Sequence, residues 1–349
     1  MRQNTSFRFS AFACVIGGIG LVGSAGAAET GSFEIHGYGS QDYLQASANQ
    51  YLGADKHGSW DNNFLGLVGA VTVNDKSKLW AQLEASSTEH VAFTWFFLDY
   101  DFSDAARAHA GRVKYPLGLY NETIDAKFLQ ASSLEPALYQ AAADVVHDAY
   151  NGVGFDYEQA LGSAGSITWQ VYGGNTFDRN PPLDIRDRRA YGARVTYHTP
   201  IDGLRVMLSG YTTQVEILAT AALVDEHRFI ASVDYAPGAW DIKSEYGEHS
   251  FQSVTGQAWY AQFGRTFGKW MPFARYDYVT TDKAKKSSDS FSQKIVVVGL
   301  NYKLESNVSL RLEDHFNHGY ALPVASDEVA AGAGKREWNL LVLGVHFMF

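Results

Sequence analysis

Glu337–Phe349, with the sequence EWNLLVLGVHFMF, ends the chain and decides the fold. Alternate positions carry two different sets of side chains: Leu341, Leu343, Val345, Phe347 and Phe349 on one, and Leu340, Val342, Gly344, His346 and Met348 on the other. Successive side chains of a β-strand point to opposite faces, so each set shares one face of a strand. Alternation sustained over this length indicates a strand rather than a helix.

The same period of two continues towards the N-terminus. In Val308–Phe316 the apolar positions Val308, Leu310 and Leu312 alternate with Ser309 and Arg311. Sixteen such segments lie between Phe33 and Phe349, and the connectors between them are alternately short and long. That alternation is typical of a transmembrane β-barrel, because its two ends face different compartments.

The sequence therefore predicts an all-β, sixteen-stranded antiparallel transmembrane β-barrel with both termini at the short-turn end. Strands can cross a bilayer only as a closed sheet, because hydrocarbon offers no partner for backbone N–H and C=O groups. Aromatic residues near predicted strand ends, such as Trp80, Tyr115, Trp240 and Trp270, fit the girdles of such a barrel. Residues 28–349 are expected to form this single domain.

Composition excludes several other classes. The chain has 349 residues, 46% of them hydrophobic, one Cys and a net charge of −10. A disulfide scaffold needs more cysteines, and an electrostatic nucleic-acid binder needs a basic face. Mean hydropathy is −0.19. No apolar run beyond residue 28 approaches the length of a membrane helix, so a helical-bundle membrane protein is excluded.

The first residues have the features of an export signal. Arg2 and Arg8 precede the apolar run Ala11–Gly23, and Ala25 and Ala27 form a small-x-small cleavage site. The run is too short to span a bilayer. We expect residues 1–27 to be a cleaved signal peptide.

These features together resemble the Gram-negative outer-membrane porins: an export signal, sixteen alternating strands, no mature cysteine and a terminal Phe349. The stretch Ala110–Tyr120 (AGRVKYPLGLY) resembles the fifth strand and following loop of porin-like proteins, including relatives of the phosphate-selective porins. The resemblance implies an outer-membrane location in a Gram-negative bacterium and a homotrimer. It also implies that the loop after the fifth strand, the third outer loop, folds into the barrel and narrows it.

Residues 116–150 form that loop, the longest connector in the chain. A loop this long within a compact domain usually has a function, and Ser132, Ser133 and Pro136 are expected to begin a short helix over Ala137–Val146. The candidate constriction residues are its acids: Glu122, Asp125, Glu135, Asp144 and Asp148. The alternative is a solvated outer loop whose acids only keep it soluble.

Cations on the predicted lumen face form the other half of the candidate site. A cation in mid-strand on the lipid side would cost about 2–4 kcal/mol, so the lumen side is favoured. The candidate wall residues are Arg112, Lys114, Arg194, Arg205, Arg228, Lys243, Arg275 and Arg311. An acidic loop opposite a basic wall would set ion selectivity; the alternative is wall charge neutralised locally by neighbouring acids.

The function predicted from these observations is passive diffusion of small hydrophilic solutes and ions through a water-filled channel in a lipid bilayer, with no enzymatic activity. One rival is a channel selective for phosphate or another anion, which would need a ladder of cations. The other is a barrel enzyme, whose nearest Ser/His pairing is His90 beside Ser86 and Ser87. His315 and His318 lack further ligands nearby in sequence, and no nucleotide motif is present, so no metal or cofactor is expected.

The apolar stretch Val215–Val224 has two possible roles, extension of the ninth and tenth strands or contact with a neighbouring subunit.

Overall fold

The computed structural model describes residues 31–86, 91–140, 149–176, 179–180, 185–322 and 334–349. In these residues sixteen strands close a barrel, and a further two-residue strand, β8 (Arg179–Asn180), pairs with β9. The barrel strands of the first half are β1 Phe33–Ala46, β2 Ser59–Asn74, β3 Ser77–Ala85, β4 Ala92–Ser103, β5 Ala106–Lys114, β6 Ala149–Ala160, β7 Ser166–Asn175 and β9 Ile185–His198. Those of the second half are β10 Leu204–Ile217, β11 Ala222–Tyr235, β12 Trp240–Phe251, β13 Val254–Arg265, β14 Trp270–Thr280, β15 Ser292–Glu305, β16 Val308–Gly319 and β17 Glu337–Met348.

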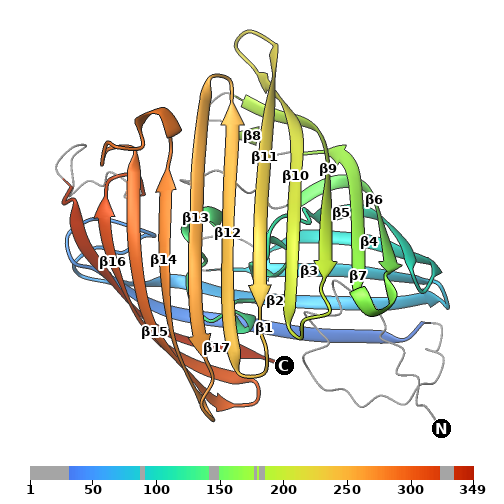
Figure 1. Ribbon diagram of the computed structural model, residues 1–349, viewed down its shortest axis with the longest axis horizontal. Coiled ribbons are helices and arrows are strands. Elements are labelled where there is room, and N and C mark those ends of the chain that lie inside the picture. The colour runs from blue at the N-terminus through green and yellow to red at the C-terminus, as the bar shows by residue number, and fades with distance from the viewer. Residues whose placement is uncertain (1–30, 87–90, 141–148, 177–178, 181–184, 323–333) are drawn as a thin grey trace.

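The sheet closes because β1 pairs with both β2 and β17, each time antiparallel. The seam extends past the last strand: Gly37 N donates to Phe349 O and Phe349 N donates to Gly37 O, both at 2.8 Å. Figure 1 shows β10 to β14 running upright at the front while β1 to β3 cross steeply behind them, as the strand tilt of a closed barrel requires. The predicted sixteen-stranded antiparallel barrel is confirmed.

The two faces of the strands differ as the alternation predicts. Leu98, Val171, Leu208 and Leu343 are among the exposed residues of the outer face. Their alternates on the inner face include many buried polar residues, such as Gln170 and Ser209. No helix in the described residues is long and apolar enough to cross a membrane. An apolar exterior around a polar interior is the arrangement that suits a strand-built span of a bilayer.

Two segments for which the sequence raised specific expectations are the one after Pro136 and the apolar stretch Val215–Val224. The expected helix over Ala137–Val146 is a single 3-10 turn, η3 (Ala137–Tyr139), in its described part, and residues 141–148 lie outside the description. Val215–Val224 extends β10 and β11, because Val215 pairs with Val224 and Ile217 with Ala222. In Figure 1 this hairpin rises above its neighbours. The predicted signal peptide also lies outside the described residues.

Candidate pore constriction

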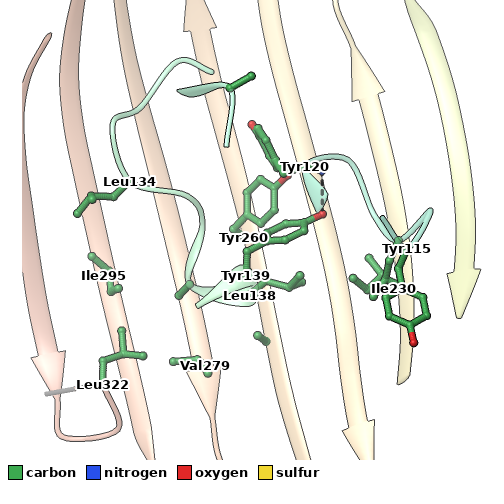
Figure 2. Packing of buried hydrophobic residues seen from close by; sticks show 14 of the residues in the cluster. Tyr115, Tyr120, Leu134, Leu138, Tyr139, Ile230, Tyr260, Val279, Ile295 and Leu322 are labelled. Carbon is green, nitrogen blue, oxygen red and sulfur yellow. Dashed lines mark hydrogen bonds between the residues drawn. The ribbon is translucent and has the colours of Figure 1, made fainter. Parts of the chain in front are cut away.

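Residues 115–140, which follow β5, form a segment packed against the inner face of the barrel. It contains three short 3-10 turns, η1 (Asn121–Thr123), η2 (Lys127–Leu129) and η3. Turn η3 lies against β13 and β14, and η2 lies against β1 and β17. Figure 2 shows Leu134, Leu138 and Tyr139 of this segment over the strands that carry Tyr260 and Ile295. We call residues 115–140 the inner segment.

Aromatic stacking holds the start of the inner segment. The ring of Tyr115 stacks on Tyr211 of β10, with centroids 4.4 Å apart and planes 9° apart. Tyr150 of β6 stacks on Tyr172 of β7 at 5.0 Å, and Tyr115 lies 5.2 Å from Tyr150. Offset aromatic pairs at such distances add about 0.5–1.5 kcal/mol each beyond burial. The four rings therefore hold the point where the chain leaves β5.

Two arginines of the wall hold the backbone of the inner segment. Arg311 of β16 donates to four carbonyl oxygens: those of Ser132 (2.6 Å), Lys127 (2.7 Å), Gln130 (2.5 Å) and Phe128 (3.3 Å). Arg275 of β14 donates to the carbonyl of Leu134 at 3.0 Å. The guanidinium group presents five donors in a fixed fork, so one side chain can hold several carbonyls.

Two carboxylates of the wall bind the donors of the inner segment. Glu245 of β12 accepts from Leu119 N at 2.8 Å and from the Tyr139 hydroxyl at 2.7 Å. Glu313 of β16 accepts from the Ser132 hydroxyl at 2.6 Å and from Ser133 N. The Ser132 and Ser133 hydroxyls therefore bind the wall, and neither caps a helix as the sequence suggested, since η3 is preceded by Pro136 with no side-chain cap.

The inner segment also reaches the opposite side of the barrel. Asp125 pairs with Lys114 of β5 and accepts from Gln82 of β3 at 3.2 Å. Glu122 pairs with Arg194 of β9. Contacts to β3 and β5 as well as to β12, β14 and β16 mean that the segment crosses the interior between these strands.

Several candidate residues from the sequence meet in this arrangement. Lys114, Arg194, Arg275 and Arg311 bind the inner segment, and Glu122 and Asp125 are among their partners. Glu135 lies 3.8 Å from Lys127 within the segment. Asp144 and Asp148 lie outside the described residues.

The remaining wall cations lie away from the inner segment. Arg228 pairs with Glu226 beside Tyr211, Lys243 pairs with Asp241, and Arg205 pairs with Asp234 near the short turns. The strand register places Arg112 beside Phe96, an exposed residue of the outer face. Arg112 donates to the carbonyl of Thr94 at 2.6 Å, and the inner positions of β5 belong to Arg107 and His109.

One group of residues that the sequence did not single out resembles a catalytic arrangement. Ser133 Oγ lies 3.0 Å from His346 Nε2, and Asp42 Oδ1 lies 2.9 Å from the same nitrogen. In a Ser-His-Asp triad the acid binds the other ring nitrogen, which orients the imidazole for proton transfer. All three residues are 2% exposed or less. The group therefore fits a contact that anchors the segment and not a nucleophile facing substrate; His90 and Ser87 lie outside the described residues.

Comparison with solved structures places the fold among outer-membrane barrels. The anion-selective porin from Comamonas acidovorans aligns with a TM-score of 0.63 at 13% identity, over 91% of this chain and 99% of that one. The trimer form of OmpT, an outer membrane protein of Vibrio cholerae, aligns with a TM-score of 0.62 at 14% identity, over 92% and 100%. The outer membrane channel DcaP of Acinetobacter baumannii aligns with a TM-score of 0.60 at 11% identity, over 92% and 98%.

No protein-family profile matches the chain, and no curated protein matches it by sequence. The structural neighbours thus include a porin and an outer-membrane channel, and this chain, a closed sixteen-stranded barrel, shares their fold. At these identities the likeness establishes the fold.

Proposed function

We propose that this chain is an outer-membrane porin that passes small hydrophilic solutes and ions down their gradients. The observation that carries the proposal is the inner segment, which polar side chains of the wall anchor across the interior of a barrel with an apolar exterior. A segment that side chains of the wall hold inside the barrel narrows the lumen and leaves both ends of the barrel open. Ion and solute selection in channels depends on the width and charge of such a narrowing.

The proposal includes the location and the assembly. Residues 1–27 would direct export and be removed, and residues 28–349 would form the barrel in the outer membrane of a Gram-negative bacterium. A homotrimer is the proposed assembly, because a neighbour of this fold is described in trimer form. The barrel would have its long connectors on the outer side, as barrels of this kind do.

The two rivals have less support. An anion or phosphate channel needs cations that solvent can reach, whereas Arg275 and Arg311 bind backbone carbonyls and are 3% exposed. An enzyme needs an accessible nucleophile oriented by its base, and the Ser133 group is buried with both partners on one nitrogen.

Conductance of the purified mature protein in planar bilayers tests the proposal. We expect stepwise, ohmic current increments on insertion, and swelling of proteoliposomes in small sugars. A folded barrel, verified by its heat-modifiable mobility on gels, that gives neither current nor swelling would contradict the porin function.

A further inference from the structure

The inner-face arginines beside the inner segment are already occupied. Arg194, Arg275 and Arg311 are each 6% exposed or less. Arg275 and Arg311 direct their guanidinium groups at carbonyl oxygens, and Arg194 binds Glu122 and Gln170. A buried cation that already binds several protein acceptors offers little to a passing anion. These arginines therefore anchor the inner segment to the barrel wall.

The carboxylates on the β3–β7 side differ, because solvent reaches them more than it reaches their partners. In the Lys114–Asp125 pair the cation is 1% exposed and the acid 19%. In the Arg194–Glu122 pair the values are 6% and 16%. At the short-turn end, Asp101 is more exposed than its partner Arg107. In these three pairs the acid is the more exposed partner, whereas in the Arg107–Asp99 pair the cation is 25% exposed and the acid 10%.

Two adjoining hollows lie along this side of the barrel. One, of about 40 Å³, lies at the β4–β5 turn, and the other, of about 30 Å³, reaches Pro116 and Glu122 of the inner segment. They share Arg107 and Asp156, so they are adjacent, and we call the two hollows together, from the short turns to the base of the segment, the route. Each is large enough for water. The acids Asp99, Asp101, Glu122 and Asp156 line this route against the cations Arg107 and Lys114.

The wall two strands beyond β7 has the reverse polarity near the turns. Arg205 of β10 is 40% exposed, while its partner Asp234 is 8% exposed. The more exposed partner is therefore a cation at Arg205 of β10, whereas the two hollows that lead to the inner segment lie along β4 to β7. Charges around a water-sized route act at distances below the Debye length of about 10 Å at 0.1 M salt.

We infer that ions cross this barrel along the β4–β7 wall and that the acidic lining of this route makes the channel prefer small cations to anions. The inference rests on the proposed porin function and names its substrate class. Carboxylates that line a pore raise the local concentration of cations and lower that of anions. Monovalent inorganic cations and small organic ammonium ions are the solutes that this lining would favour.

Reversal potentials in a KCl gradient test the inference. For the unmodified channel we expect a permeability ratio of K⁺ to Cl⁻ of about three or more at 0.1 M salt. The double substitution Asp99→Asn with Asp156→Asn removes two acids from the route without touching the inner segment, and should lower the ratio by about half or more. The matched control, Asp234→Asn with Asp241→Asn, removes two inner-face acids from β11 and β12 and should change the ratio far less.

A channel that conducts but prefers Cl⁻, or in which both double variants shift the ratio equally, would overturn the inference while the porin function stands. Absence of any conductance would instead overturn the porin function. A second measurement keeps the inference testable if the Asp99→Asn, Asp156→Asn variant does not fold. Asp156→Cys introduces the sole thiol of the mature chain, and it should react faster with a cationic methanethiosulfonate than with an anionic one. Equal rates, or a faster anionic reagent, would also overturn the inference.

Discussion

Replacement of Arg311 by Met should release part of the inner segment from the barrel wall. The guanidinium of Arg311 donates to the carbonyls of Lys127, Phe128, Gln130 and Ser132, and Met retains most of the aliphatic volume without the donors. The strands themselves keep their ladder hydrogen bonds, because Arg311 pairs with Gly344 through the backbone. The perturbation therefore acts on the docking of the segment and only weakly on the barrel.

The magnitude follows from the number and burial of these contacts. A hydrogen bond to a charged group contributes about 1.5–3 kcal/mol, and four bonds from one side chain are not additive. Removal of one partner from a buried charged network costs about 3–5 kcal/mol. That cost raises the population of undocked segment by about two to almost four orders of magnitude. Arg275, Glu245 and Glu313 still hold residues 119 and 132–139, so the release is confined to residues 127–131.

Trypsin offers a direct assay, because the carbonyl of Lys127 is both a scissile group and an acceptor of Arg311. We expect cleavage after Lys127 to accelerate by at least about a hundredfold in Arg311→Met, since cleavage tracks the open population. We also expect a higher single-channel conductance and passage of larger sugars. The matched control is Arg205→Met, an inner-face arginine that pairs with Asp234 and does not contact the segment. Equal cleavage rates and equal conductance in the two variants would refute the assigned role of Arg311.

Two further predictions concern the barrel itself. In Gly152→Val the new Cβ would collide with the backbone of Gly173 and Gly174 in β7, so the β6–β7 pairing should be impaired and the fraction of heat-modifiable folded protein should fall, whereas Gly69→Val, whose nearest neighbour is the Phe33 ring at 3.5 Å, folds normally. Leu208 on the outer face of β10 is 52% exposed, and Leu208→Arg should destabilise the barrel by about 2–4 kcal/mol in lipid. Leu208→Phe is its control, and equal urea midpoints for the two variants in lipid vesicles would contradict a lipid-facing position.

The barrel was predictable because strand periodicity is a local property. Side chains alternate with a period of two, so Leu310 and Leu312 indicate one face and Arg311 and Glu313 the other without knowledge of the partner strand. The assignment of Arg194, Arg275 and Arg311 to the inner face follows from that alternation and agrees with the strand register. The groups that these arginines bind could not be predicted from the alternation. The path of residues 115–140 across the interior depends on contacts with strands far apart in the sequence.

Arg112 illustrates where alternation is insufficient. Arg112 and Lys114 have the same parity in β5, and the sequence places both on the lumen face. The structure joins Lys114, the last residue of the strand, to Asp125 inside the barrel, whereas Arg112 lies beside Phe96. The strand ladder ends at Lys114 and the chain enters the inner segment at Tyr115, so the Lys114 side chain is not bound to the alternation of β5. Residue type alone does not reveal where a strand ends.

The sequence did contain one signal for the position of the inner segment. In β15 and β17 both faces are apolar: Ile295 and Val297 point inward beside outward Val296 and Val298, and Leu340 and Val342 point inward beside outward Leu341 and Leu343. A water-filled lumen gives no stabilisation to inward aliphatic side chains, each of which gains about 1.5–3 kcal/mol only when covered. Strands that are apolar on both faces inside a barrel therefore indicate that another part of the chain covers them. Here Leu134 and Leu138 of the inner segment belong to the same buried cluster, so the apolar inner face of these strands indicates where the inner segment docks.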